Sequence, residues 1–211
     1  MKYTDVVTNT EVYGMESAVK GSKYPMAVDL NKVDGNVVPR THALANAKPG
    51  SGHDNFLNGI LVQFDLTFTN KAWVEMERYH FIDFISSQST MHRITKFNLD
   101  EVYISYTDPR IIEIMKEKVA AYNDLQKVIS DKKIAGEDVS ELSEQAKEKY
   151  LEILYSNPAG FRLTARMTTN YRQLKTIYAQ RKTHRLPEWR AFCDWVETLP
   201  NASFITNIEQ K

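Results

Sequence analysis

Residues 60–69 read ILVQFDLTFT, and this stretch decides the fold class. Its apolar and polar side chains alternate, which places Ile60, Val62, Phe64, Leu66 and Phe68 on one face. Alternation with a period of two is typical of a β-strand that buries one side. We therefore predict a strand here, with its polar face turned away from the core.

After residue 69 the apolar residues recur at intervals of three and four, which predicts helices packed against a sheet. Asp108 and Pro109 mark the start of a long helix, because aspartate caps a helix and proline fits its first turn. The other expected helices cover residues 71–86, 140–156, 169–182 and 187–199. Between the long helix and the helix at 140–156, a charged stretch around residues 127–150 predicts an exposed helical hairpin.

Residues 14–59 contain six of the eight glycines of the chain and are expected to be rich in loops. Helices gathered after the strand signal predict an α+β fold. A length of 211 residues fits a single domain that spans residues 1–211.

The composition excludes several classes of protein. Hydrophobic residues make up 42% of the chain, which is enough for a globular core. Lys and Arg number 27 against 27 Asp and Glu, which argues against long nucleic acids and anionic membranes as partners. The N-terminus lacks an apolar leader and no 18-residue apolar run exists, so we expect a cytoplasmic protein.

The single cysteine, Cys193, cannot form an intramolecular disulfide and is expected to pack in the core. His42, His80 and His184 lack the spacing of metal ligands, so no metal site is predicted. The common nucleotide-binding and hydrolase motifs are absent as well.

Two polar clusters are the candidates for chemistry. Residues 88–98 read QSTMHRITKFN, which combines an imidazole, a guanidinium, a lysine and carboxamides. Arginine offers fixed paired donors to phosphate, so an anion or cofactor site is one interpretation and a solvated loop is the other. The second cluster, residues 170–185, places Asn170 and Arg181 on one helix face, where they could share a cleft. Its simpler interpretation is a basic helix end that faces the negative end of the helix dipole.

Together these segments resemble the flavin-dependent thymidylate synthase family. Residues 88–93, QSTMHR, and Asn98 match that family's Gln-x-x-Arg-His-Arg core and its following asparagine. Gly52-His53-Asp54 is similar to the family's Gly-His-Glu turn before a Phe-rich strand. A third match, in the family's order and spacing, comprises Pro158, Gly160, Thr168, Asn170, Arg172, Leu174 and Arg181. The resemblance covers about residues 50–200.

The resemblance implies a central antiparallel sheet with long helices, and a homotetramer whose flavin sites lie at subunit contacts. The implied reaction is the reductive methylation of dUMP to dTMP, with methylenetetrahydrofolate, NADPH and FAD. Reduced FAD would supply the hydride, which fits the lack of an obvious nucleophile. The implied FAD contacts are His53, His92, Arg93, Asn98, Asn170 and Arg172. Gln88 and Arg181 are the implied catalytic residues, which hold the pyrimidine.

The chain departs from the family's pattern at several positions. Met91 stands where the first motif arginine is expected, and Leu154 replaces a later arginine. Leu99, Glu101 and Tyr103 replace a glutamate, a phosphate-binding serine and another arginine. Three hypotheses therefore stay open: a thymidylate synthase, a flavoprotein that modifies another pyrimidine nucleotide, and a non-catalytic oligomeric module on the same scaffold.

Overall fold

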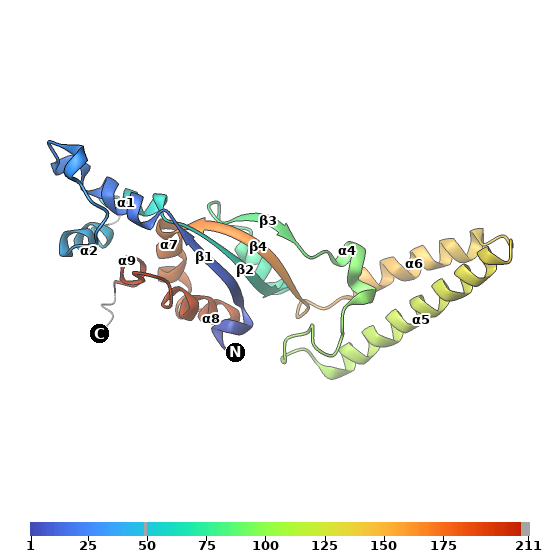
Figure 1. The fold of residues 1–211 in the computed structure, drawn as a ribbon. Helices are drawn as coiled ribbons and strands as arrows, with labels where there is room; N and C mark the ends of the chain where they lie inside the picture. Colours follow the sequence, from blue (N-terminus) through green and yellow to red (C-terminus); the bar gives the residue numbers. More distant parts are fainter. Residues whose placement is uncertain (49, 208–211) are drawn as a thin grey trace. The chain divides into compact units, whose positions relative to one another are not determined.

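The structure is a computed structural model that describes residues 1–48 and 50–207 (Figure 1). The chain divides into two compact units, and each is described by itself. Unit 1 comprises Met1–Phe68, Val74–Ser87 and the described part of Thr164–Lys211, and unit 2 comprises Thr69–Trp73 and Gln88–Leu163. The single domain expected from the chain length stays a prediction.

A mixed sheet-and-helix architecture confirms the α+β fold class. Within the described residues, the strands β1 (Val7–Tyr13), β2 (Leu61–Thr69), β3 (Asp83–Ser87) and β4 (Arg162–Asn170) form one sheet. Their order is β1-β2-β4-β3 (Figure 1). β1 is antiparallel to β2, with Val12 opposite Val62, and β3 is antiparallel to β4, with Phe84 opposite Met167.

The strand predicted from the alternation at residues 60–69 is confirmed as β2. Ile60, Val62, Phe64, Leu66 and Phe68 are each 0% exposed. Aromatic side chains of α8 (Pro187–Val196) cover this face. The Phe64 ring lies 4.5 Å from that of Trp195, and the Phe68 ring lies 5.0 Å from that of Trp189. Burial of this face against α8 forms the core of unit 1.

Helix α7 (Tyr171–Arg181) follows β4 directly, because Asn170 ends the strand and caps the helix. Its Oδ1 accepts a hydrogen bond from the N–H of Gln173 at 2.9 Å. The predicted apolar side of this helix is buried, including Leu174 and Ile177. The Tyr171 hydroxyl donates to the carbonyl of Pro200 at 2.6 Å, which links α7 to the chain beyond α8.

Short elements connect β1 to β2 and complete unit 1. The 3-10 turns are η1 (Tyr3–Asp5), η2 (Tyr24–Met26), η3 (Leu30–Lys32) and η4 (Asn55–Gly59). The short helices are α1 (Met15–Ser22), α2 (Pro39–Ala45) and, near the C-terminus, α9 (Ser203–Thr206). The glycine-rich segment therefore contains brief helices as well as the expected loops.

Unit 2 contains the predicted helical hairpin. Its arms are α5 (Pro109–Ile134) and α6 (Ser140–Ser156), which lie side by side (Figure 1). Asp108 caps α5 as predicted, because its Oδ1 accepts a hydrogen bond from the N–H of Arg110 at 2.9 Å. The short helices α4 (Thr90–Arg93) and η5 (Ile94–Lys96) precede the hairpin.

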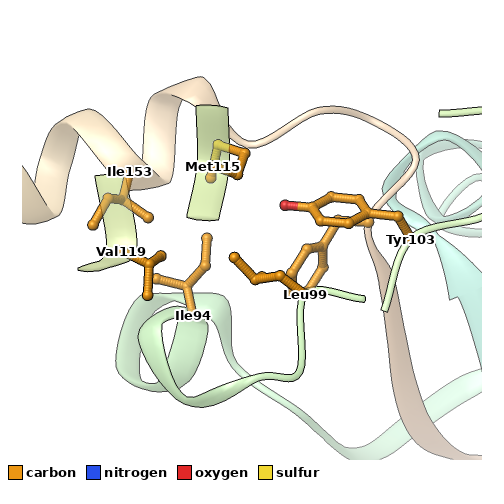
Figure 2. Packing of buried hydrophobic residues seen from close by; sticks show 7 residues of the cluster. Ile94, Leu99, Tyr103, Met115, Val119 and Ile153 are labelled. Carbon is orange, nitrogen blue, oxygen red and sulfur yellow. The ribbon is translucent and has the colours of Figure 1, made fainter. Parts of the chain in front are cut away.

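One hydrophobic cluster holds unit 2 together. It packs residues from the segment at 94–103 against the two hairpin helices (Figure 2). Its buried members are Ile94, Leu99, Tyr103, Met115, Val119, Ile153 and Phe161. Burial raises the pKa of the Tyr103 hydroxyl to about 12, and this group donates to Oδ1 of Asn157 at 3.0 Å.

The helix predicted at residues 71–86 is wrong over its second half. Helix α3 covers only Asn70–Met76, and residues 83–87 form β3 at the edge of the sheet. Phe84 and Ile85 are about half exposed there, at 47% and 51%. Their spacing suited a helix, but pairing with β4 determined the outcome.

Two strands carried no recognised signal. β1 has only one buried residue, so its sequence does not alternate. β4 buries Ala165, Met167 and Thr169, and this mixture of small, apolar and polar residues conceals the period of two. For the same reason the helix predicted from residue 169 begins two residues late, at Tyr171.

Across the described ranges, 1–48 and 50–207, none of the helices combines the length and apolar character needed to cross a membrane.

A substitution at Gly14 tests whether the close approach of this residue to Gly59, in the turn before β2, contributes to stability. Its φ is 77°, and a Cβ there would lie 2.3 Å from the carbonyl oxygen of Gly59. We expect Gly14→Ala to lower the free energy of unfolding by about 2–4 kcal/mol, because a left-handed backbone and an overlap are combined. Urea titration followed by tryptophan fluorescence measures this change.

Gly52→Ala is the matched control. Gly52 has the same φ of 77°, but a Cβ there would meet only the side chain of Asn55 at 3.6 Å. We expect a loss of about 1–2 kcal/mol from the backbone alone. Equal losses in the two variants would show that the close approach of Gly14 to Gly59 is not a constraint.

Candidate functional site

The polar cluster predicted at residues 88–98 lies in unit 2 around α4. His92 and Arg93 are exposed at the end of this short helix, and Gln88 precedes it, also exposed. Within the described residues, neither His92 nor Arg93 forms an ion pair with a carboxylate. Both side chains are thus open to solvent and to a ligand.

Asn98 has a structural task in this cluster. Its Oδ1 accepts a hydrogen bond from the N–H of Asp100 at 3.1 Å, and its carbonyl accepts from the N–H of Glu101 at 3.1 Å. These bonds close the turn that leads to Leu99, which is buried in the cluster of unit 2. Its carboxamide nitrogen remains as a donor for a ligand.

A second group of predicted residues meets in unit 1, around the buried Asp54. Lys175 Nζ lies 3.2 Å from Asp54 Oδ2, and Arg172 Nε lies 3.6 Å from Oδ1. Asp54 is 5% exposed, and its Oδ1 accepts no hydrogen bond within the described part of the chain. Two cations share one carboxylate, so the group keeps a positive charge.

His53 and Asn170 belong to the same neighbourhood. His53 adjoins Asp54 in the chain, is exposed, and follows Gly52. Asn170 caps α7 two residues before Arg172, so its Oδ1 is used while its carboxamide nitrogen is not. Asn170 and Arg172 are thus neighbours at the start of α7, and Asp54 pairs with Arg172, whereas His53 is related to them only by its place beside Asp54 in the chain.

Arg181 lies at the other end of α7 and is held on several sides. Its Nη1 donates to Glu75 Oε2 at 3.1 Å, and its Nε donates to the Tyr79 hydroxyl oxygen at 2.8 Å. The guanidinium carbon lies 4.6 Å from the ring centre of Trp189, a cation–π arrangement. Only 12% of the Arg181 side chain is exposed. Its Nη2 makes no hydrogen bond to the described residues.

Glu75 is the centre of this second network. Besides Arg181, its Oε2 accepts from Trp189 Nε1 at 3.1 Å and lies 3.3 Å from His184 Nε2. The backbone N–H of Leu186 donates to His184 Nδ1 at 3.2 Å, so the ring hydrogen of neutral His184 is on Nε2 and faces Glu75. One carboxylate oxygen thus organises donors from α7, α8 and the loop between them.

Asn170 and Arg181 lie at the two ends of α7, about three turns apart as their spacing predicts, and the cleft that they could share stays a prediction. They flank an 11-residue helix, which separates them by about 16 Å along its axis. Asn170 contacts the helix start, whereas Arg181 contacts Glu75 and Trp189. The two residues therefore contribute to different parts of unit 1.

Cys193 is confirmed as a packing residue. It is 1% exposed, and burial raises the pKa of its thiol to about 12. A thiol with this pKa stays protonated near neutral pH, so it does not provide a nucleophile.

Three of the departures from the family's motifs occupy the interior of unit 2. Leu99 and Tyr103 are 6% and 7% exposed and belong to the hydrophobic cluster (Figure 2). Leu154, on α6, packs against the same cluster. Glu101 is exposed, and its carbonyl accepts a hydrogen bond from Arg162. Leu99 and Tyr103 therefore serve packing, whereas Glu101, at the position of the family's phosphate-binding serine, stays exposed.

Sequence reasoning did not find Glu75 and gave Asp54 no role of its own. Glu75 offered one signal, a carboxylate between the apolar residues Trp73 and Met76 of a helical pattern. Asp54 stood within a recognised tripeptide, but its pairing with Lys175 joins residues 121 positions apart. Such long-range pairs cannot be read from local spacing.

The fold places the chain in a known structural class. No protein-family model matches the sequence, and no curated protein matches it either. Among solved structures, the fold is that of ThyX flavin-dependent thymidylate synthases, at a sequence identity low enough to show the fold alone.

Two of these structures come from Helicobacter pylori. One is thymidylate synthase X with FAD and dUMP, which has a TM-score of 0.64 and 15% identity and covers 96% of this chain and 97% of its own. The other is flavin-dependent thymidylate synthase ThyX complexed with FAD and dUMP, with a TM-score of 0.64 and 14% identity. It covers 98% of this chain and 99% of its own.

The Glu75 network makes a testable prediction about stability. We expect Glu75→Ala to lower the free energy of unfolding by about 2–4 kcal/mol, because Arg181 and the Trp189 N–H lose a largely buried acceptor. Glu75→Gln should cost less, because a carboxamide oxygen still accepts from Trp189. Chemical denaturation measures both changes.

Glu77→Ala is the control, since Glu77 is exposed two residues away. It should change the free energy of unfolding by no more than about 0.5 kcal/mol. Equal free energies of unfolding for Glu75→Ala and Glu77→Ala would show that the network does not stabilise the fold.

Proposed function

We propose that the chain is a flavin-dependent thymidylate synthase-like enzyme. Its reaction is the reductive methylation of dUMP to dTMP, with methylenetetrahydrofolate as carbon donor, FAD as cofactor and NADPH as reductant. The observation that carries this proposal is the likeness of fold over 96% of this chain and 97% of a thymidylate synthase X that binds FAD and dUMP. The motif residues of the sequence add to it.

The donors present in each unit fit a dinucleotide cofactor. Arg93 and His92 are exposed cations or donors without a carboxylate partner among the described residues. Arg172 shares Asp54 with Lys175, which leaves positive charge beside His53 and Asn170. Guanidinium groups of this kind bind pyrophosphate oxygens through paired hydrogen bonds.

The chain's own residues then act by binding and orientation. Arg93 and Arg172 hold phosphate oxygens, and the carboxamide nitrogens of Asn98 and Asn170 donate to polar edges of the cofactor. Arg181 has one remaining donor, Nη2, for a pyrimidine carbonyl, and Gln88 of unit 2 is the other residue that the resemblance assigns to the pyrimidine. Bound reduced FAD supplies the hydride. A fixed arginine stabilises negative charge that develops on the carbonyl, because Glu75 and Trp189 hold its guanidinium in place.

A homotetramer is part of the proposal. Several large apolar side chains are exposed in the isolated chain, including Met26 at 70%, Phe81 at 65%, Ile134 at 84% and Tyr155 at 88%. Exposed apolar side chains of this number are typical of surfaces that subunits cover. Flavin sites at subunit contacts would be completed by such an assembly.

A second candidate has its own observation. Leu99 and Tyr103 lie in the hydrophobic cluster, and Leu154 is an apolar residue packed against it, so none of the three offers a cationic donor to a nucleotide phosphate. An enzyme that keeps the flavin but modifies a different pyrimidine nucleotide accounts for this loss. The same loss is compatible with a non-catalytic module, which the experiments below distinguish.

Binding of FAD is the first test. The purified protein, incubated with FAD and freed of excess, should retain a visible flavin spectrum. Arg93→Gln and Arg172→Gln should each weaken binding about tenfold or more, because each removes a charge-assisted hydrogen bond. Arg110→Gln is the matched control, since Arg110 is 87% exposed in an ion pair with Asp108. A colourless protein whose Tm does not change with FAD would contradict the proposal.

Substrate identity is the second test. We expect calorimetry to detect binding of dUMP, and tritium release from labelled dUMP in the presence of methylenetetrahydrofolate, NADPH and FAD. Gln88→Ala should lower kcat/KM about tenfold, while Gln145→Ala, an exposed glutamine of α6, leaves it unchanged. Flavin binding together with selection of another pyrimidine nucleotide would favour the second candidate. Absence of both flavin and nucleotide binding would leave the non-catalytic module.

A further inference from the structure

Unit 2 contains a groove that starts at the predicted FAD contact His92 and continues along the helical hairpin, beyond the predicted site. It has a volume of about 1000 Å³ and follows one face of α5 and α6. On α5 its lining residues are Tyr122, Gln126, Ile129 and Lys133, which recur at helical intervals. The lining spans 12 residues on this helix, from Tyr122 to Lys133, or about 16 Å of rise along its axis.

The groove is free of acidic groups, although the helices are not. α5 and α6 each carry four Asp or Glu residues, and none of these lines the groove. Three lysines line it instead, namely Lys96, Lys133 and Lys147, together with His92. The arrangement leaves a basic surface within an otherwise acid-rich hairpin.

The lysines are available to a ligand. Within residues 1–48 and 50–207, Lys96 and Lys133 have no carboxylate partner. Lys147 pairs with Glu144 at 2.6 Å, but the two side chains are 70% and 69% exposed. An ion pair this exposed contributes little, so a phosphate can replace Glu144 as the partner of Lys147.

An aromatic pair lies in the same groove. The rings of Tyr122 and Tyr150 are 5.1 Å apart and inclined by 54°. The Tyr150 hydroxyl donates to the carbonyl of Met91 at 3.0 Å, which fixes this ring against the segment that carries His92 and Lys96. Burial is the main cause that raises the pKa of Tyr150, so its hydroxyl stays neutral and adds no negative charge.

We propose that the groove between α5 and α6 binds a phosphorylated molecule with an aromatic ring, of nucleotide size. Lys133 and Lys147 bind its phosphate groups as point charges, and the Tyr122–Tyr150 pair contacts its ring. The volume lies at the upper end of the range for ligand sites, about 300–1000 Å³. The inference deepens the proposed function and rests on it, because the ligands of that function are nucleotides.

The lining favours a ligand over a helix of a second copy. A groove that accepts a helix presents apolar anchors at successive turns. Here Gln126, Lys133, Ser143 and Lys147 occupy such positions and Ile129 and Ala146 between them are buried, so the exposed apolar residues of the lining, Met91 at 59% and Leu151 at 49%, lie beside polar and basic groups. Polar and basic groups at alternate turns suit a charged small molecule.

The test titrates ADP into the full-length protein by calorimetry at low and at moderate salt. ADP supplies a ring and phosphates, but FAD contains the same moiety, so the titration is repeated with saturating FAD. Unchanged ADP affinity is expected, and displacement of ADP by FAD would assign the signal to the flavin site and overturn the inference. We expect binding that weakens with salt, because the contacts are between charges. The double variant Lys133→Gln/Lys147→Gln should weaken it about tenfold or more. Glutamine has nearly the helix propensity of lysine, so the hairpin is preserved, and the Tm verifies this.

Lys127→Gln/Lys149→Gln is the matched control. It removes the same charge from exposed lysines of the same two helices that do not line the groove. Equal ADP affinity in the two double variants, or no ADP binding at millimolar concentration, would overturn the inference. A change in sedimentation without a change in ADP affinity would overturn it too, and would assign the groove to a second copy of the chain.

The outcomes separate this inference from the proposed function. One outcome is that the variant Lys133→Gln/Lys147→Gln keeps its affinity for ADP, its FAD binding and its dUMP turnover. That result would reject the groove site and support the proposed function. Lysine-dependent ADP binding in a protein that binds neither FAD nor dUMP would support the groove site and remove the proposed function.

Discussion

Burial of one face of β2 is the constraint on which unit 1 depends. A strand that buries five consecutive inward residues needs a partner surface of matching size, and the aromatic residues of α8 provide it. Once α8 covers this face, Trp189 lies at a fixed place beside the end of α7. The hydrophobic core thus determines where an arginine can stack, before any polar contact is considered.

The polar networks of unit 1 then follow from the cost of burying charge. Arg181 is largely buried, and a guanidinium in that position requires a nearby carboxylate, which Glu75 supplies. Asp54 is a buried carboxylate and needs cationic partners. Lys175 and Arg172 supply the positive charge. Each network fixes a side chain to which the proposed chemistry assigns a role, so a substitution there is expected to change the stability of unit 1 as well.

Elements with a local signal could be predicted, and elements that depend on distant partners could not. The alternation in β2 and the cap at Asp108 act within a few residues, and both predictions were confirmed. β3 was mistaken for helix because its identity depends on pairing with β4. The same limit applied to the candidate site, where a polar cluster around His92 was readable while Glu75 was not, since its partner Arg181 lies 106 residues away.

The interior position of Leu99 and Tyr103 has a consequence for how this chain can change. Their side chains pack with Ile94, Met115 and Ile153, so a charge introduced at either of them would be buried without a partner. A single substitution towards the family's motif would therefore first damage the stability of unit 2. A charged residue at either position would therefore need a second substitution that supplies it with a buried partner.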